Sequence, residues 1–425
     1  MILIILITIF ISLILLFLIR KRSILEPAKI FSLYWLIQLI LIPIFFFNVY
    51  DFHGLAFLYI LVSIAIMLYT SNIGKAIATS SGFTNNRIEF NEKRSRLIFV
   101  LVIILAFVYP FYQLTHYGFS IQDFLSINQL LEMNNTIAAD RYSGAEEFTI
   151  LDQLLLVFVY LAPLYAGYIS TFFDKKKQTF FYIAFVPALV VALSQSMKAG
   201  FIASVFLWLT GKIVAMYSTD KQLPRFNTKV ILISTLIILV FLGLLFFSML
   251  LRTNEINSDT ISFISYRFVN YGFGHLVAFD DWILTGWNSY YPFELKTFYG
   301  ISNYLGLASR EQGVFTEFFS YGNGNVSGEM VTNVYTAFRF LIEDFGFFGS
   351  FIFFGLFGLF SGFSFLKIKN NPNTIAWKVI HSAFLFFIFY SFATSVWAYT
   401  SYIVVFILFY LLLKLSYKPL TKDEY

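Results

Sequence analysis

The sequence contains no cysteine among its 425 residues. This absence excludes a disulfide bond, a catalytic thiolate and any metal site with cysteine ligands. Histidine is almost as scarce, since His53, His116, His275 and His381 are the only four and lie far apart in the sequence. The chain has no H-E-x-x-H motif and no other metal-ligand spacing. We therefore predict no metal site and no cofactor.

Charged residues are also few. Only 12% of the residues are charged and 59% are hydrophobic, with a mean hydropathy of +0.75. Soluble domains average about 25% charged and roughly 45–50% apolar residues. This composition excludes a soluble enzyme, a disordered chain, a coiled coil and a nucleic-acid-binding protein as descriptions of the whole chain. The protein is predicted to be a polytopic membrane protein.

The apolar runs are long enough for helices. Each is about 17–23 residues of continuous apolarity, whereas the strands of a membrane barrel would be ~10-residue alternating segments. We predict an all-α polytopic membrane protein that forms one integral membrane domain over residues 1–425. The expected number is about eleven transmembrane helices, at 2–19, 30–47, 55–72, 97–115, 151–173, 178–194, 199–217, 230–251, 344–366, 376–397 and 400–416.

The positions of the basic residues predict the orientation. No basic residue precedes the first apolar run, and the cluster 20–22 (Arg-Lys-Arg) follows it, which indicates an uncleaved first span with the N-terminus outside. With this orientation 22 of the 29 Lys and Arg lie inside, and 17 of the 24 Asp and Glu lie outside. The C-terminus is then cytoplasmic. The basic isoelectric point is thus explained by the membrane topology and does not indicate an anionic partner such as nucleic acid.

Two segments predicted to lie outside are long, at 116–150 and 252–343. The cytoplasmic loops are short, and the chain has no G-x-x-x-x-G-K-[ST] motif, so transport driven by ATP within this chain is not expected. Long loops in compact proteins are usually functional or disordered. The second segment is rich in aromatic residues, which argues against disorder. We expect it to form a large extracytoplasmic loop, folded as a cap with short helices at the membrane surface.

Two cations lie at the predicted outer ends of spans. Lys198 follows Ser194-Gln195-Ser196-Met197 in a tight turn between two spans. A lysine at this depth is a functional candidate, but its side chain could equally reach the lipid headgroups. Arg252 ends the eighth span, where a cation suits both the helix C-terminus and the headgroup region. Both interpretations stay open for each residue.

The aromatic segment and its acidic pair each have two interpretations. The aromatic rings could stack on sugar rings or form an interfacial belt, and we favour the belt for most of them. Asp280 and Asp281 could bind a divalent cation or act as acid and base, although adjacent residues diverge on a helix and a solvated pair is favoured. The rings concerned belong to Tyr266, Tyr271, Phe273, Trp282, Trp287, Tyr290, Tyr291, Phe298, Tyr299 and Tyr304.

The most specific pattern is N-V-Y-T-x-x-R-x-x-x-x-D-F-G-x-x-G at residues 333–349. On a helix, Tyr335, Arg339 and Glu343 would form one stripe at spacing i, i+4 and i+8. Such a stripe could serve only as an interfacial anchor, with Tyr335 on Arg339 and Arg339 paired with Glu343. Gly346 and Gly349 would then allow close helix packing. The D-F-G string has none of the other motifs of a protein kinase.

This string, which follows a long outer loop and precedes the last spans, resembles Wzy-type O-antigen polymerases, the polymerases of oligosaccharide repeat units. The chain length and the number of spans are similar to that family as well. The matching residues are Asn333, Tyr335, Thr336, Arg339, Asp344, Gly346 and Gly349. Lys198 departs from the pattern, because related sequences often have arginine in a similar turn.

The resemblance implies a membrane-embedded glycosyltransferase of the lipid-donor class in the bacterial cytoplasmic (inner) membrane. Such an enzyme joins undecaprenyl-pyrophosphate-linked oligosaccharides into O-antigen or capsular polysaccharide at the outer face, with polyprenyl pyrophosphate leaving. Its partners would be membrane lipids, a chain-length regulator and a flippase. The expected catalytic residues are Arg339, Glu343 and Asp344, of which a carboxylate would be the base. Cations stabilise a leaving pyrophosphate, and the expected substrate-binding residues are Lys198, Arg252, Arg267, Asn333 and Tyr335.

Three other functions stay open. A flippase for lipid-linked oligosaccharides would need polar residues along a path through many spans, whereas here the polar residues lie mostly in outer loops. An O-antigen ligase would carry out the same class of reaction on a different acceptor. A scaffold in an envelope assembly complex would need no catalytic residue.

Overall fold

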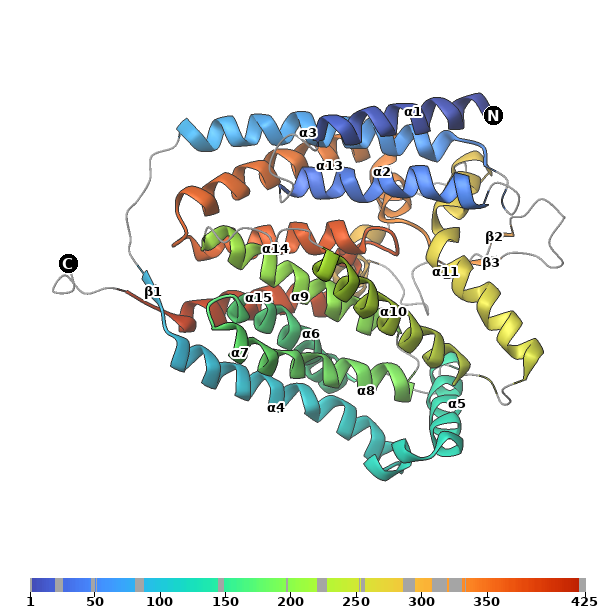
Figure 1. Ribbon diagram of the computed structural model, residues 1–425, viewed down its shortest axis with the longest axis vertical. Coiled ribbons are helices and arrows are strands. Elements are labelled where there is room, and N and C mark those ends of the chain that lie inside the picture. Colours follow the sequence, from blue (N-terminus) through green and yellow to red (C-terminus); the bar gives the residue numbers. More distant parts are fainter. Residues whose placement is uncertain are drawn as a thin grey trace. The chain divides into compact units, whose positions relative to one another are not determined.

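The protein is helical in the parts of the chain that the computed structural model describes. These are residues 2–19, 26–46, 50, 52–80, 88–143, 149–195, 198–219, 228–251, 253, 257–285, 295–307, 319–320, 331–332 and 334–419. The α-helices are α1 (Ile2–Ile19), α2 (Pro27–Phe46), α3 (Leu55–Ser80), α4 (Glu92–His116), α5 (Ile127–Ser143), α6 (Ile150–Ser170), α7 (Lys175–Gln178), α8 (Val186–Gln195), α9 (Lys198–Ser218), α10 (Thr228–Leu250), α11 (Ser258–Thr285), α12 (Tyr299–Tyr304), α13 (Ala337–Asn370), α14 (Ile375–Tyr390) and α15 (Thr400–Ser416) (Figure 1).

Short elements connect these helices. The 3-10 helices are η1 (Ile121–Leu125), η2 (Thr179–Phe185), η4 (Lys296–Phe298) and η5 (Val396–Ala398). Four short strands form two antiparallel pairs, β1 (Ile88–Phe90) with β4 (Tyr417–Pro419), and β2 (Phe319–Ser320) with β3 (Val331–Thr332). Helices thus dominate the fold.

Seven helical segments in the described residues are long and apolar enough to cross a membrane. Four shorter apolar helical stretches, at Ile5–Leu16, Ile238–Leu250, Ile375–Tyr390 and Thr400–Ser416, also coincide with predicted spans. The prediction of an all-α polytopic membrane protein is confirmed. The count of eleven spans and the extracytoplasmic position of the large loop stay predictions.

The chain divides into two compact units. The first unit contains Met1–Asn85 and Val269–Ile403, and the second contains Asn86–Phe268 and Val404–Tyr425. The sequence predicted one integral membrane domain over residues 1–425, and this stays a prediction.

Glycines allow α3 and α13 to pack closely in the first unit (Figure 1). A Cβ atom at Gly358 would lie 2.6 Å from the carbonyl oxygen of Met67, and one at Gly362 would collide with the carbonyl oxygen of Ser71. At Gly74 it would collide with the carbonyl oxygen of Leu359. These are small-residue contacts of the kind that membrane helices use to bring their backbones together.

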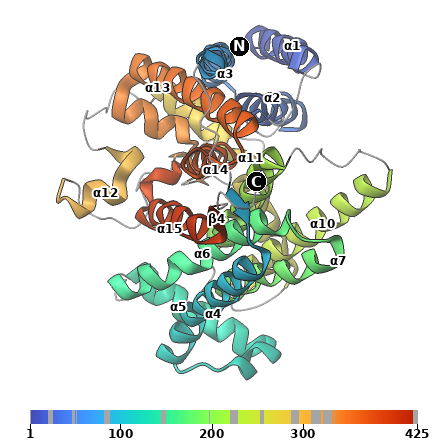
Figure 2. The ribbon, with the colours of Figure 1, turned by 90° about the vertical axis from the view of Figure 1, so that its left-hand side faces the viewer.

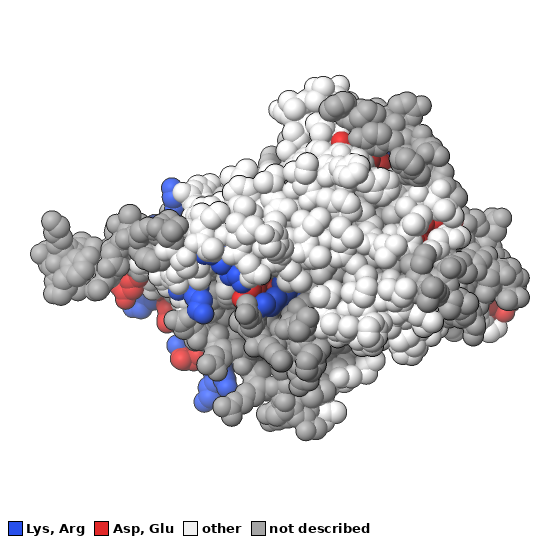
Figure 3. Space-filling view, turned by 90° about the horizontal axis from the view of Figure 1, so that it is seen from above, with Lys and Arg blue, Asp and Glu red and all other residues white. Residues whose placement is uncertain are grey.

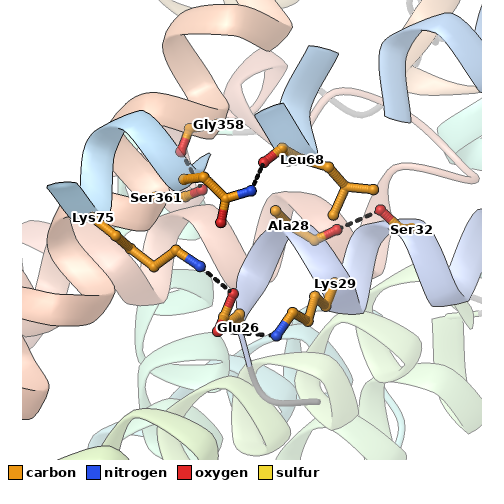
Figure 4. A network of polar contacts seen from close by, with 9 residues as sticks. Glu26, Ala28, Lys29, Ser32, Leu68, Lys75, Gly358 and Ser361 are labelled. Carbon is orange, nitrogen blue, oxygen red and sulfur yellow. Dashed lines mark hydrogen bonds and ion pairs between the residues drawn. The ribbon is translucent and has the colours of Figure 1, made fainter. Parts of the chain in front are cut away.

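Polar groups mark both ends of α3. At its beginning, the backbone N–H groups of His53, Gly54 and Ala56 donate to the Asp280 carboxylate. Lys75 follows Leu55 by twenty residues, or about 30 Å of helix, which is the thickness of a bilayer's hydrocarbon core. There Glu26 binds Lys75 Nζ at 2.8 Å and Lys29 Nζ at 3.0 Å (Figure 4). The first unit therefore has charged clusters separated by roughly one membrane thickness.

Charge is unevenly distributed on the surface. Figure 3 views the protein from the side on which α1 and α3 lie, and the described Lys and Arg side chains gather toward one end of that view. Uncharged side chains cover most of the remaining described surface in the figure. This is the pattern expected for helices that expose apolar side chains to lipid along most of their length.

In the second unit, α6 and α9 cross at Gly167 and Gly211. A Cβ atom at either glycine would collide with a carbonyl oxygen on the other helix. The hydroxyl of Tyr165 lies 2.7 Å from Ser416 Oγ, and the hydroxyls of Tyr168 and Tyr417 lie 2.6 Å apart. These contacts join α6 to the end of α15 and to the C-terminal strand β4.

Several predicted boundaries differ from the structure. In the described part of the 252–343 segment, residues 258–285 form one helix of 28 residues, short helices occur at 296–304, and α13 begins at Ala337. The segment was predicted to be a loop with short helices, but the buried side chains of 276–279 stabilise a long helix there. In the tenth predicted span, 376–397, the α-helix ends at Tyr390, and the 3-10 helix η5 begins at Val396. The 116–150 segment includes helix α5.

Candidate functional site

Helix α13 consists of two limbs that fold back on each other at Gly346. Gly346 has φ 67° and ψ 176°, a conformation that is essentially restricted to glycine. The ring centroids of Phe338 and Phe354 lie 5.4 Å apart, although sixteen residues of straight helix would separate them by about 24 Å. Residues 337–345 are therefore a short half-helix that packs against the long limb 347–370 (Figure 2). Gly346 enables a chain reversal and not the predicted close helix packing.

The half-helix is inserted into the interior of the first unit. Every residue from 335 to 344 is buried. At its N-terminal end, the backbone N–H of Ala337 has a hydrogen-bond partner within the protein. It donates to the carbonyl oxygen of Ser391 at 2.7 Å. Irregular backbone at membrane depth is tolerated where protein covers it. The segment at 391–395, which ends α14 early, supplies that cover.

Arg339 lies in the first turn of the half-helix and is paired with Glu343. Its Nε donates to Glu343 Oε1 at 2.7 Å, and only 3% of its side chain is exposed. The guanidinium carbon lies 4.2 Å from the Tyr335 ring centroid and 5.1 Å from that of Trp282. The predicted contacts of Arg339 with Tyr335 and Glu343 are thus present. Tyr335, however, lies in the extended segment 334–336 and not on the helix.

A second cation reaches the other oxygen of the same carboxylate. Lys296 Nζ lies 2.8 Å from Glu343 Oε2, with 25% of the lysine side chain exposed. Asp344 accepts the backbone N–H groups of Lys296 and Thr297 at 2.7 and 2.6 Å. Two consecutive carboxylates of the half-helix therefore hold the turn at 295–298. In this arrangement Glu343 bridges two cations and Asp344 positions the backbone that carries one of them.

Nearby polar contacts stabilise the same region. Ser395 Oγ donates to the carbonyl oxygen of Thr297 at 3.1 Å, and Trp35 Nε1 donates to Ser391 Oγ at 3.0 Å. His275 on α11 contacts Gln38 on α2 at 2.6 Å, and burial lowers the pKa of its imidazole to about 3. This histidine is therefore neutral at physiological pH.

Asp280 is a structural carboxylate. It is fully buried and accepts the backbone N–H groups of His53 at 2.5 Å, Gly54 at 2.9 Å and Ala56 at 2.8 Å. An acceptor at the beginning of a helix satisfies N–H groups that lack a partner within the helix. Burial raises the pKa of this carboxyl group, and the three hydrogen bonds oppose the shift. The favoured interpretation of a solvated pair is wrong for Asp280, because the tertiary fold covers it.

The remaining predicted residues do not join this cluster within the first unit. Lys198 begins α9 and Arg267 lies on α11 with its guanidinium carbon 4.5 Å from the Phe263 ring centroid, and both belong to the second unit. Arg252 and Asn333 lie outside the described residues. The described residues contain no group of three or more His, Asp or Glu that could bind a metal ion.

Two residues of the cluster were missed as site residues. Trp282 was one of the rings for which sugar stacking and an aromatic belt both stayed open, and Lys296 was not singled out as a candidate. The sequence separates Lys296 from Glu343 by 47 positions, and no local spacing links them. Only the fold-back of the half-helix onto the 295–298 turn brings them together.

Comparison with protein-family models, with curated proteins and with solved structures found no match for this chain. The resemblance of residues 333–349 to Wzy-type polymerases therefore stays a prediction from the sequence. The case for a function rests on that pattern together with the geometry of the Arg339 cluster.

Proposed function

We propose that this protein is a glycosyltransferase that polymerises polyprenyl-pyrophosphate-linked oligosaccharide repeat units at the outer face of a bacterial cytoplasmic membrane. The observation that carries the proposal is the convergence of Arg339 and Lys296 on Glu343 at the half-helix. The half-helix that carries Arg339 packs against the beginning of α3, since the ring centroids of Phe338 and Tyr59 lie 5.6 Å apart. Cations held in place before the reaction stabilise a leaving pyrophosphate.

The reaction needs no nucleotide outside the cell. A hydroxyl group of the acceptor sugar attacks the anomeric carbon of the donor, and the bond from that carbon to the pyrophosphate oxygen breaks. The pyrophosphate leaves with the electron pair, and a base takes the hydroxyl proton. Arg339 and Lys296 would neutralise the leaving group. Glu343 or Asp344 would take the proton after its present partners move away.

Arg339 provides the direct test. In a strain that lacks the gene, Arg339→Ala should abolish the polysaccharide ladder on a gel, and Arg339→Lys should restore it only in part. A guanidinium binds two phosphate oxygens at once, which an ammonium group does not reproduce. Lys75→Gln is the control, since Lys75 forms an ion pair of the same 2.8 Å length at the other end of α3. A full ladder from Arg339→Ala at matched expression would exclude the catalytic role.

A lipid-linked oligosaccharide flippase is the second candidate. Lys378 and His381 are fully buried in α14, and His381 Nδ1 lies 2.8 Å from Ser364 Oγ on α13. Buried ionisable residues within membrane helices often mark a transport path.

The deletion strain separates these functions. Loss of a polymerase leaves single repeat units on the acceptor, while loss of a ligase leaves long polymer on the lipid carrier. Loss of a flippase leaves repeat units on the inner leaflet, beyond the reach of an externally added glycosidase.

A further inference from the structure

A 3-10 helix of unusual length lies in the second unit. Helix η2 contains seven residues, whereas 3-10 runs longer than three or four residues are uncommon. Side chains three residues apart lie directly above one another in such a helix. Phe181 and Ala184 therefore share one edge of η2, and both are buried. The 3-10 geometry thus divides this segment into edges that repeat every three residues.

A second edge of η2 is apolar and exposed. Phe180 and Ile183 lie on it, Val186 at the start of α8 continues it, and each of the three side chains is 38% exposed. An α-helix would rotate such side chains apart by about 60° at every step of three residues. In a 3-10 helix they form a straight apolar ridge about 12 Å long. The ridge belongs to the segment Lys175–Gln195, which is long and apolar enough to cross a membrane. It is therefore suited to contact one lipid acyl chain along its length.

Basic residues precede this apolar ridge. Helix α7 contains three exposed lysines at 175–177, and Lys177 precedes Phe180 by the same interval of three residues. Arg96, at the beginning of α4, lies beside the ridge, with its guanidinium carbon 5.4 Å from the Phe180 ring centroid (Figure 1). Cations therefore lie at the end of the ridge that follows the turn after α6.

The charge of this surface is positive when every carboxylate is counted. Residues 89–97 and 172–187 contain six Lys or Arg and three Asp or Glu. Lys418, which lies 3.4 Å from Glu89, is a seventh cation. Asp174 lies 3.6 Å from Lys177, but both side chains are more than half exposed, so this pair contributes little. Seven cations and three anions leave four positive charges, and such clusters attract anionic lipid headgroups.

We propose that α7 and η2 form a binding site for an anionic phospholipid. The headgroup phosphate lies against the lysines of α7 and Arg96, and one acyl chain lies along the ridge of Phe180, Ile183 and Val186. The lysines alone would be explained by the orientation of a span. The straight apolar ridge that follows them adds a contact for the acyl chain of the same lipid. The inference concerns the second unit and does not depend on the proposed polymerase function.

Native mass spectrometry of the purified full-length protein with dioleoylphosphatidylglycerol tests the headgroup contact. The double variant Lys175→Gln with Lys176→Gln should bind this lipid about 10- to 30-fold more weakly, as expected for two lysines near an anionic headgroup. The control is Lys367→Gln with Lys369→Gln in the last turn of α13, which removes the same charge and should change the affinity less than about twofold. Equal affinities for the wild type and the α7 double variant would overturn the proposal.

A second set of measurements tests the acyl contact. Ile183→Ser should weaken binding of the same lipid about three- to tenfold, because it removes apolar surface from the ridge. Ile380→Ser in α14 alters an isoleucine of similar exposure, 40%, and should have little effect. Inorganic phosphate should not displace the lipid, and dioleoylphosphatidylcholine should bind more weakly. Displacement by phosphate, or equal binding of the two lipids, would contradict a site for an anionic phospholipid.

The same spectra identify a protein occupant of this surface. If a second copy of the chain covers the lysines of α7, the wild type should give a dimer that the α7 double variant loses, while its affinity for phosphatidylglycerol stays unchanged. That result would assign the surface to a protein interface and overturn the proposal. A monomer that retains phosphatidylglycerol through the α7 lysines supports it.

Discussion

At the residue scale, burial changes what the Arg339–Glu343 pair contributes. An exposed pair of this spacing contributes about 0–1 kcal/mol, and its loss would hardly matter for stability. The observed pair is buried, and removal of one partner of a buried pair costs about 3–5 kcal/mol because the other charge stays unpaired. Loss of activity in a single variant therefore has two possible causes, which a paired replacement separates.

The paired replacement is Arg339→Met with Glu343→Leu. Each single change should lower the free energy of unfolding by about 3–5 kcal/mol, whereas the double change should recover most of this loss, since apolar residues of similar size often substitute for a buried pair. The polysaccharide ladder should stay absent in the double variant. Melting curves in detergent and gels from matched strains measure both properties. A double variant that is stable and makes a full ladder would show that the pair is only an anchor.

Asp280 leads to a prediction about metal dependence. Its carboxylate is occupied by three backbone N–H groups at the beginning of α3. The proposed polymerase activity of the purified protein should therefore persist in EDTA. Asp280→Ala should destabilise the protein by about 1–2 kcal/mol or more, as loss of a helix cap does. Activity that disappears in chelator and returns with Mg²⁺ or Mn²⁺ would contradict this assignment.

At the element scale, the reversal of α13 at Gly346 determines the geometry of the site. A straight helix of the same sequence would carry Arg339 away from Trp282 and from the 295–298 turn. The half-helix 337–345 is too short to cross a membrane, while the limb 347–370 is long enough. The reversal at Gly346 therefore lets the half-helix bring Arg339 to Trp282 and Glu343 to Lys296.

Gly346→Ala tests the importance of this reversal. The observed φ and ψ are strained for any residue with a Cβ atom, so the substitution should cost about 1–3 kcal/mol and reduce polymer. Gly272→Ala in α11 is a suitable control, because the Cβ atom that alanine adds there would have nothing within 4 Å and the backbone is helical. Melting temperature and ladder intensity give the comparison. If Gly346→Ala behaves like Gly272→Ala, the backbone conformation at Gly346 is not required.

At the scale of the whole molecule, chain direction constrains the topology. Tyr59 near the start of α3 donates to Ser350 Oγ at 2.7 Å, and Gly362 faces Ser71 further along. Helix α3 and the long limb of α13 therefore run parallel. The predicted topology requires both to cross in the same direction. The side of the membrane on which each end lies is a prediction from the basic residues alone.

Reporter fusions test that prediction. A fusion at Lys176 should report a cytoplasmic position, and one at Asn288, outside the described residues, should report an extracytoplasmic position, because basic loops stay inside. Alkaline phosphatase and a cytoplasmic fluorescent reporter give opposite signals at the two sites. Both fusions on the same side would be incompatible with the orientation and with a site at the outer face.

The sequence by itself determined the class of the protein and much of the local chemistry. Long apolar runs require helices in a membrane, because unpaired backbone groups are too costly in lipid. The spacing of Arg339 and Glu343 predicted their contact, since residues four apart are neighbours on any helix. Local spacing carried this information, so no tertiary contact was needed to infer it.

The tertiary structure decided everything that depends on segments distant in the sequence. Lys296 and Trp282 join Arg339 only because α13 reverses at Gly346. A single glycine in a helical sequence pattern does not predict such a reversal. Asp280 is buried because it caps α3, more than two hundred residues earlier in the chain. The physical reason is that burial and pairing of charges depend on which helices meet, whereas periodicity in the sequence reports only that each helix has an apolar surface.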